Sequence, residues 1–178
     1  MNPETIVNFW MEAGDLRWFT RDAAFDGALS VRFGEALKEA RLGAFDHWAK
    51  TPEGALGLVI LLDQVSRNIH RGSPLAFAAD ARALRLAKDC VSRGFHQKLP
   101  PLQAMWLLMP FEHAEDLDAQ RRCLALFGTL GLHEMVYYAQ VHLDIIAKFG
   151  RFPHRNPILG RKSSAAEVAF LKAGGFAG

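Results

Sequence analysis

Three short stretches of the chain gather carboxylates, guanidiniums and imidazoles, the usual side chains of a binding or catalytic pocket. Long apolar segments flank each stretch, so the polar groups stand out from their surroundings. The three sequence clusters are Asp63, Arg67, Asn68 and Arg71; Glu112, His113, Glu115 and Asp116; and His142, Arg151, His154, Arg155 and Asn156. Together they predict a site for a small anionic ligand, with general acid–base catalysis as the chemistry that such a site could support.

In the first cluster, Asp63, Arg67 and Arg71 recur at intervals of four residues, which places them on one face of a helix. If that face is exposed, the ion pair contributes only about 0–1 kcal/mol and needs no further role. Because the helix is otherwise strongly apolar, Arg67 could instead be buried, and a buried guanidinium must be paired. The sequence favours structural pairing, and it leaves ligand contact open for Arg67, Asn68 and Arg71.

In the second cluster, Glu115 and Asp116 are explained as acids at the N-terminus of the next helix. That explanation does not cover Glu112 and His113, which closely follow Pro110. A carboxylate beside a histidine can act as a general acid and base, so these two residues are the predicted catalytic pair. The same pair would also supply two metal ligands.

The spacing of the potential metal ligands matches no familiar site. His133-Glu134 is not followed by the second histidine of an HExxH motif, and neither cysteine belongs to a CxxC pair. A composite site from His113, His142 and His154 stays open as a weaker alternative, and no metal ligand is predicted. The chain lacks a GxSxG elbow, so the sequence gives little support for nucleophilic catalysis, and it lacks a Gly-rich phosphate loop; the cofactor, if any, stays unknown.

The third cluster lies mostly in a loop that follows a helix ending near Gly150, with Pro153 and Pro157 preventing easy continuation of that helix. A connector needs no such density of cations. Guanidiniums bind carboxylate or phosphate in two-point contacts, which predicts an anion site. In this interpretation Arg67, Arg151 and Arg155 bind the anion, while His142, His154 and Asn156 orient it.

The alternative for this loop is structural. Its arginines would then hold the loop against carboxylates such as Glu112 or Asp63, and this arrangement could coexist with a ligand, since such pairing often orients site residues.

Composition excludes several other classes of function. A net charge of +2 over 178 residues gives no reason to expect nucleic acid or an acidic membrane as a partner. The longest apolar run, residues 55–62, is far shorter than the roughly 20 residues of a membrane-spanning helix, and no signal peptide is visible. Cys90 and Cys123 lie in apolar patterns typical of buried thiols in a reducing compartment. We therefore predict a soluble, cytoplasmic protein.

Helical periodicity and cap signals recur along the chain, and no run alternates like a strand. We expect one all-α domain, residues 1–178, of about eight or nine helices packed as antiparallel pairs. Its helices are predicted over residues 3–13, 20–37, 42–50, 52–71, 73–93, 101–109, 115–130, 133–149 and 164–172. No fixed repeat period is found.

Several of these segments resemble one bacterial family of unknown function, DUF924. The segments that carry the resemblance are ILLDQVSRNIHRGSPLAFAADARAL, MPFEHAED and FGRFPHRNPILGRKSSAAEVAFL, with NFWMEAG near the start. The resemblance covers essentially the whole chain and implies an all-α fold similar to tetratricopeptide-repeat (TPR) proteins. It implies no activity. Val65-Ser66, where the family usually has Phe-Pro, and Ala114, where it commonly has Ser, depart from the pattern.

Two hypotheses about function follow. If the chain forms a small-molecule site, the three clusters converge and His113 lies on the same side of the molecule as Arg155. If it is a TPR-like module for a peptide or protein partner, a groove exposes aromatic residues such as Trp10, Trp18 or Trp48. Core packing is the favoured interpretation of the tryptophans.

Overall fold

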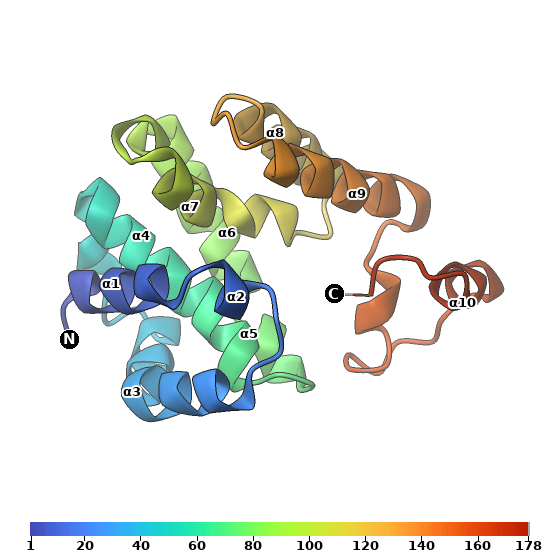
Figure 1. The fold of residues 1–178 in the computed structure, drawn as a ribbon, viewed down its shortest axis with the longest axis horizontal. Coiled ribbons are helices and arrows are strands. Elements are labelled where there is room, and N and C mark those ends of the chain that lie inside the picture. Colours follow the sequence, from blue (N-terminus) through green and yellow to red (C-terminus); the bar gives the residue numbers. More distant parts are fainter. Residues whose placement is uncertain (178) are drawn as a thin grey trace.

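The computed structural model describes residues 1–177, which form helices joined by turns and short loops, with no strand among them (Figure 1). The all-α prediction is confirmed. Among residues 1–177, eight α-helices have eight or more residues, while α2 and α5 have four each, which agrees with the expected number. The α-helices are α1 (Pro3–Ala13), α2 (Asp15–Trp18), α3 (Ala23–Arg41), α4 (Pro52–Ile60), α5 (Ser66–Ile69), α6 (Asp80–Ser92), α7 (Pro101–Glu112), α8 (Leu117–Phe127), α9 (His133–Phe149) and α10 (Ala165–Lys172).

Shorter helical turns connect these elements. Four are 3₁₀ helices: η1 (Asp46–Lys50), η3 (Pro74–Phe77), η4 (Phe95–Lys98) and η5 (Pro153–Arg155). The fifth, η2 (Leu61–Val65), is a π-helix. The helix predicted over 42–50 is therefore a 3₁₀ turn, and the one predicted over 73–93 divides into η3 and α6.

Most helix starts follow the cap signals of the sequence. The side chains of Asn2 and Thr51 accept backbone hydrogen bonds in front of α1 and α4, and Ser164 forms a capping box with Glu167 in front of α10. The start predicted at Thr20 is wrong. Asp22 caps α3 instead, because its carboxylate accepts from two backbone amides, whereas the Thr20 hydroxyl donates back to the Leu16 carbonyl.

The end of α7 was also predicted wrongly. This helix does not stop before Pro110 but continues through it to Glu112, with His113 as its C-cap. The fixed φ of proline suits a helix, so near the last turn only one backbone hydrogen bond is lost. Glu112 and His113 therefore have helix-like backbone conformations at the C-terminal end of the buried helix α7.

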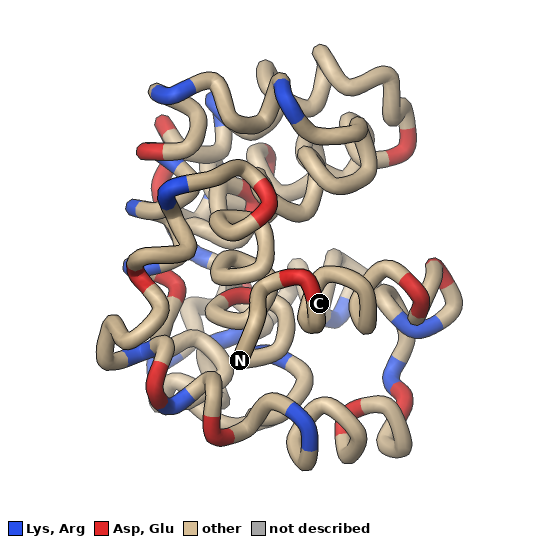
Figure 2. Tube along the Cα trace, turned by 90° about the vertical axis from the view of Figure 1, so that its left-hand side faces the viewer, with Lys and Arg blue, Asp and Glu red and all other residues tan. Residues whose placement is uncertain are grey.

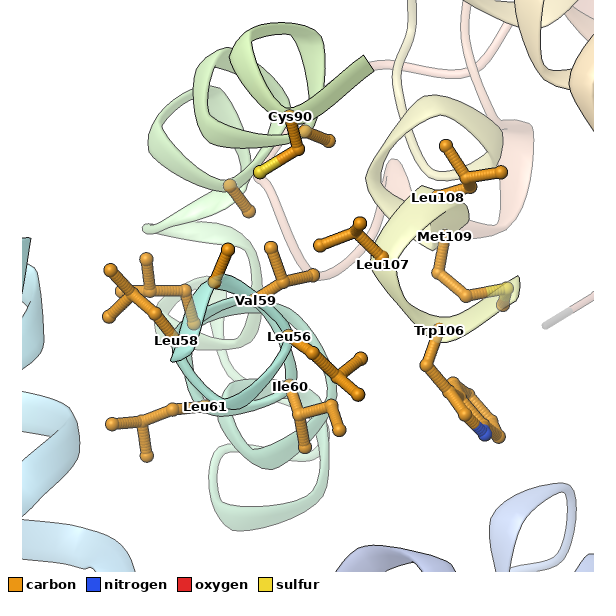
Figure 3. Packing of buried hydrophobic residues seen from close by; sticks show 14 of the residues in the cluster. Leu56, Leu58, Val59, Ile60, Leu61, Cys90, Trp106, Leu107, Leu108 and Met109 are labelled. Atoms are coloured by element: carbon orange, nitrogen blue, oxygen red, sulfur yellow. The ribbon is translucent and has the colours of Figure 1, made fainter. Parts of the chain in front are cut away.

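The core lies around α4 and α7, which are buried from Gly54 and from Ala104 onward, respectively. Leu107 of α7 points toward Leu56 and Val59 of α4 (Figure 3). Helix α1 also packs closely against α4, and the Trp10 ring of α1 meets the Trp106 ring of α7 edge-on at 5.2 Å. This rigid centre carries the segments that bring polar side chains together.

Helix α4 continues without a break through the π-helix η2 into α5. The sequence predicts one regular helix here, with Asp63, Arg67 and Arg71 on one face. The π-helix contains Asp63, and the helical rod ends at Ile69, so Arg71 lies beyond it. Local widening of this kind is frequent at functional sites, although it has no signature in the apolar pattern.

The chain after α9 forms a small separate layer beside the rest of the molecule (Figure 1). Gly150, at a φ of +69°, ends α9 and turns the chain into η5 and α10. A second hydrophobic cluster joins Ile145 and Ile146 of α9 to Phe152 of this layer, and Phe176 packs against it. The layer places the third sequence cluster beside the main body.

Charged residues of both signs are interspersed along the chain (Figure 2). Within residues 1–177, no helix is long and apolar enough to cross a membrane. Cys90 and Cys123 are buried and free, as the sequence predicts.

Candidate functional site

Members of all three sequence clusters meet at one place. We call this group the central polar cluster: Asp63, Arg67, Asp80, Glu112, His113, His142, His154 and Arg155. It draws on the π-helix, on α5, on the first residue of α6, on the end of α7, on α9 and on η5. His113 and Arg155 are close enough for the charge of Arg155 to influence the His113 imidazole.

The core of the cluster is an aspartate–histidine pair. Nδ1 of His113 lies 2.9 and 2.8 Å from the two carboxylate oxygens of Asp63, which is wholly buried, and the Gln64 amide donates to Asp63 at 2.7 Å. Burial of Asp63 opposes its ionisation, but the charge of Arg67 and the contacts with His113 outweigh it and hold the pKa of Asp63 at about 2. An ionised Asp63 can only accept, so Nδ1 of His113 carries the proton.

The other ring nitrogen of His113 is therefore the basic one. Burial, followed by the charge of Arg67, lowers the pKa of His113, so the imidazole is neutral at pH 7 and Nε2 has a free lone pair. The contacts of the His113 ring with Asp63 are both made by Nδ1. A buried carboxylate that fixes the tautomer of a histidine and leaves Nε2 available is the arrangement used for general-base catalysis.

Two guanidiniums lie next to this pair and share a second carboxylate, Asp80. Arg67 donates to both oxygens of Asp80, at 2.8 and 3.1 Å, and also lies 3.6 Å from Asp63. Arg155 approaches Asp80 to 3.6 Å. Asp80 was not predicted, because it lies outside the three polar stretches and inside the segment that the sequence predicts as one helix over residues 73–93.

Arg155 is the least satisfied charge of the group. Its side chain is only 8% exposed, and its guanidinium lies over the rings of Phe152 and Phe77, at 4.4 and 4.8 Å from their centres. Its buried Nε has no hydrogen-bond partner within residues 1–177. Burial and the neighbouring Arg67 lower the pKa of Arg155 to about 10, which still leaves it charged at pH 7.

A second carboxyl–imidazole contact lies behind the first. Nδ1 of His142 is 3.3 Å from Oε1 of Glu112 and donates to the Tyr138 carbonyl at 2.8 Å. Burial, reinforced by the charge of Asp63, raises the pKa of Glu112 to about 8, and burial lowers the pKa of His142 to about 4. Both groups are therefore neutral at pH 7, and Glu112 is a protonated acid.

His154 completes the cluster on the side of the C-terminal segment. Its ring lies between those of Phe152 and Phe176, with both centroid distances 5.7 Å. Burial and the charge of Arg155 lower the pKa of His154 to about 4, so it is a neutral imidazole. Its buried Nδ1 has no hydrogen-bond partner in the described part of the chain.

The other predicted ligand-binding residues contact different protein groups. Asn68 and Arg71 both donate to Asp26 of α3, and Arg151 donates to both oxygens of Glu167. Asn156 bridges the side chains of Ser163 and Arg161, and Arg161 pairs with Glu115. These residues join helices and loops, which is the structural alternative that the sequence left open.

Neither a group of metal ligands nor either of two surface hollows coincides with the central polar cluster in residues 1–177. Across residues 1–177, no three His, Cys, Asp or Glu side chains gather as metal ligands would. A hollow of about 270 Å³ lies near Leu58 and Arg82, and one of about 650 Å³ lies near Val91 and Phe111. No residue of the central polar cluster lines either of them.

Comparisons with known proteins establish the relationship of the chain. A protein of unknown function from Agrobacterium tumefaciens has a solved structure that is similar over 96% of this chain and 97% of its own, with a TM-score of 0.92 and 38% sequence identity. The comparison with curated proteins finds no match. Residues 6–175 match the family described as "Bacterial protein of unknown function (DUF924)". The chain therefore belongs to the DUF924 family.

Proposed function

We propose that the central polar cluster binds a small anionic ligand, a carboxylate or a phosphate, and supports general acid–base chemistry on it. The observation that carries this proposal is the contact of His113 Nδ1 with both oxygens of the wholly buried Asp63. That contact fixes the tautomer and leaves Nε2 as a base beside Arg67 and Arg155. A purely structural histidine would not need a buried, ionised partner, whose desolvation is costly.

In this proposal each residue has one role. Nε2 of His113 accepts a proton from the ligand, and Asp63 stabilises the imidazolium that forms. Arg67 and Arg155 hold the anionic group and favour negative charge that develops nearby. Glu112, protonated at neutral pH, holds a proton next to the same site. His142 and His154 are neutral and orient their neighbours.

A TPR-like interaction module is the alternative, and its main expectation meets little support. Trp10 and Trp48 are buried in the core, as is Trp106, and the half-buried Trp18 packs edge-on against Trp106 at 5.1 Å. The tryptophans therefore do not line an exposed groove for a peptide. A TPR-like, superhelical arrangement of the helices is part of this alternative proposal.

We also propose that the protein works in the cytoplasm. The support is the state of its thiols, since both are free and buried, and burial raises the pKa of Cys90 to about 12 and that of Cys123 further still. Such thiols are inert and suit a reducing compartment. Fractionation of cells that express the tagged chain tests this directly.

A thermal-shift screen tests the ligand proposal. The purified protein is heated with carboxylates, phosphorylated metabolites, nucleotides and divalent metals. A ligand at about 100 times its Kd should add roughly 2.7 kcal/mol to the free energy of unfolding, which raises Tm by roughly 5–10 °C. The shift should disappear in Arg155→Lys, because a lysine cannot reproduce the planar contacts of the guanidinium.

The matched control is Arg151→Lys. Arg151 belongs to the same loop but pairs with Glu167, so this variant should keep the full ligand shift. Equal loss of the shift in both variants would mean that the loop as a whole, and not the central polar cluster, responds to the ligand. A broad panel that gives no shift in the wild-type protein would contradict the proposal.

A further inference from the structure

The carboxylate of Asp80 holds the position that an anionic ligand would take. It receives two parallel bonds from the Arg67 fork, at 2.8 and 3.1 Å, and it faces Arg155 at 3.6 Å. Two-point contact of a planar guanidinium with a planar carboxylate is the geometry by which proteins recognise carboxylate ligands. The two arginines come from α5 and from η5, which are distant in sequence.

Two carboxylates pair with these arginines, and of the two only the side chain of Asp80 is positioned to turn away from them. Its side chain is 22% exposed, and it occupies the first residue of α6. Asp63 has no exposed side-chain surface and is held by His113 and Gln64 as well as by Arg67. Rotation of the Asp80 side chain toward solvent would uncover both guanidiniums without disturbing the aspartate–histidine pair.

The charges of the cluster limit the ligand to one negative charge at this position. Arg67 and Arg155 are balanced by Asp63 and Asp80, because Glu112 is neutral at pH 7. Replacement of Asp80 by a single carboxylate restores the balance. A phosphate monoester carries about −1.5 to −2 charges at pH 7, so it would leave an excess of negative charge inside a poorly hydrated cluster.

Arg155 provides a reason for a ligand to bind in preference to Asp80. It makes no contact with Asp80 closer than 3.6 Å, and its Nε is buried without a partner within residues 1–177. A ligand not tethered to α6 can move closer to Arg155 and make the hydrogen bonds that Asp80 does not.

We infer that Asp80 is an internal stand-in for the carboxylate of a ligand, and that the site takes a monocarboxylate between Arg67 and Arg155. This inference rests on the proposed function, since it names the class of ligand for the same site. It selects the carboxylate from the two anion classes that the sequence left open.

The test uses Asp80→Ala, with acetate, inorganic phosphate and chloride as probes at equal ionic strength. Removal of Asp80 uncovers the two guanidiniums, so the Tm of the variant falls. Acetate should then raise that Tm saturably, by roughly 5–10 °C at about 100 times its Kd. Phosphate should raise it less, and chloride should not raise it in a saturable way.

Asp26→Ala is the matched control. Asp26 accepts two bonds from Arg71, at 2.8 and 3.0 Å, in the same two-point geometry, but a second guanidinium does not pair with it in residues 1–177. Its Tm should show no saturable response to acetate. A response equal to that of Asp80→Ala would reduce the effect to ordinary ion binding at any uncovered arginine, and would overturn the inference.

If Asp80→Ala does not fold, Asp80→Asn keeps the size of the side chain and weakens its hold on the arginines. The Nε–Hε resonance of Arg155 should then move saturably with acetate and less with phosphate. An equal response to acetate and phosphate, or no response, contradicts the carboxylate assignment. A wild-type ligand shift that depends on Arg155, together with such a negative result, would remove this inference and leave the proposed function standing.

Discussion

Among single residues, the proposed acid–base chemistry depends on which groups are charged. Asp63 is ionised in spite of complete burial, while Glu112, buried nearby, is protonated. The difference has a physical cause, since Asp63 has Arg67 and His113 as partners, whereas Glu112 faces a neutral imidazole and the negative charge of Asp63. Carboxylates whose surroundings separate their pKa values in this way are typical of acid–base sites.

Glu112→Gln tests the protonated state. Between the usual pKa of a glutamate, about 4.3, and about 8, the folded protein retains a proton that the unfolded chain has released, so its free energy of unfolding falls as pH rises. The amide does not titrate. The wild-type protein should therefore lose stability relative to Glu112→Gln between pH 5 and pH 8, by up to about 1.4 kcal/mol per pH unit. Urea unfolding at a series of pH values measures this, and parallel curves would show that Glu112 is ionised.

Asp63→Ala tests the cost of the buried pair. Removal of this buried carboxylate leaves the half-buried Arg67 with less compensating negative charge and His113 without its partner, so the variant should lose about 3–5 kcal/mol of stability in urea unfolding. Asp118→Ala removes a carboxylate whose pair with Arg121 is largely exposed, and it should cost less than about 1 kcal/mol. Similar losses in the two variants would contradict the assignment of a buried ionic centre.

At the scale of elements, the site depends on close packing of helices α1, α4 and α7. Gly57 of α4 lies where α1 passes, and a Cβ at this position would stand 2.8 Å from Pro3 Cβ and 3.0 Å from the Pro3 carbonyl oxygen. The backbone of α1 would have to move. Gly34, inside α3, has open space around the same position.

Gly57→Ala should therefore destabilise the protein, by about 1–3 kcal/mol, the usual cost of overpacking a core. Gly34→Ala should stabilise it by about 0.5–1 kcal/mol, because alanine loses less conformational freedom in a helix. Chemical denaturation of both variants gives the two signs. Stabilisation by Gly57→Ala would mean that α1 does not lie against α4 as described.

The sequence predicts the elements better than their details. Asn2-Pro3, Thr51-Pro52 and Ser164 with Glu167 mark helix starts correctly, because caps are local. The π-helix at Asp63 and the passage of α7 through Pro110 depend on packing that no local pattern records.

The same limit applies to the site. Arg67, His113 and Arg155 can be singled out from their types and spacing, whereas Asp80 and the partners of Arg71 and Arg151 are decided by tertiary contacts. Sequence reasoning therefore identifies the participants of a polar site more readily than their pairing.

In the molecule as a whole, the layer formed by the chain after α9 completes the central polar cluster, because it supplies His154 and Arg155. Glu115 attaches this layer to the main body: it accepts from the Phe152 amide at 2.8 Å and from Arg161 at 2.5 and 2.8 Å. Phe176 adds an edge-on contact with His142 at 4.6 Å.

Glu115→Ala should loosen this layer selectively. Without the carboxylate, the Phe152 amide and the Arg161 guanidinium lose their shared partner, so amide hydrogen exchange should become faster in η5 and α10. Exchange in α4 and α7 should stay slow, since their core does not involve Glu115. Uniformly faster exchange would show that the layer and the body unfold as one unit.

The protonation state of His113 decides whether this residue can act as the base. Long-range ¹H–¹⁵N correlation spectra of the imidazole, assigned by comparison with His113→Gln, distinguish the two neutral tautomers from the imidazolium. We expect a neutral ring at pH 7 with the proton on Nδ1 and an unprotonated Nε2. A proton on Nε2, or a doubly protonated ring at pH 7, would contradict it, because His113 could not then act as a base beside the two arginines.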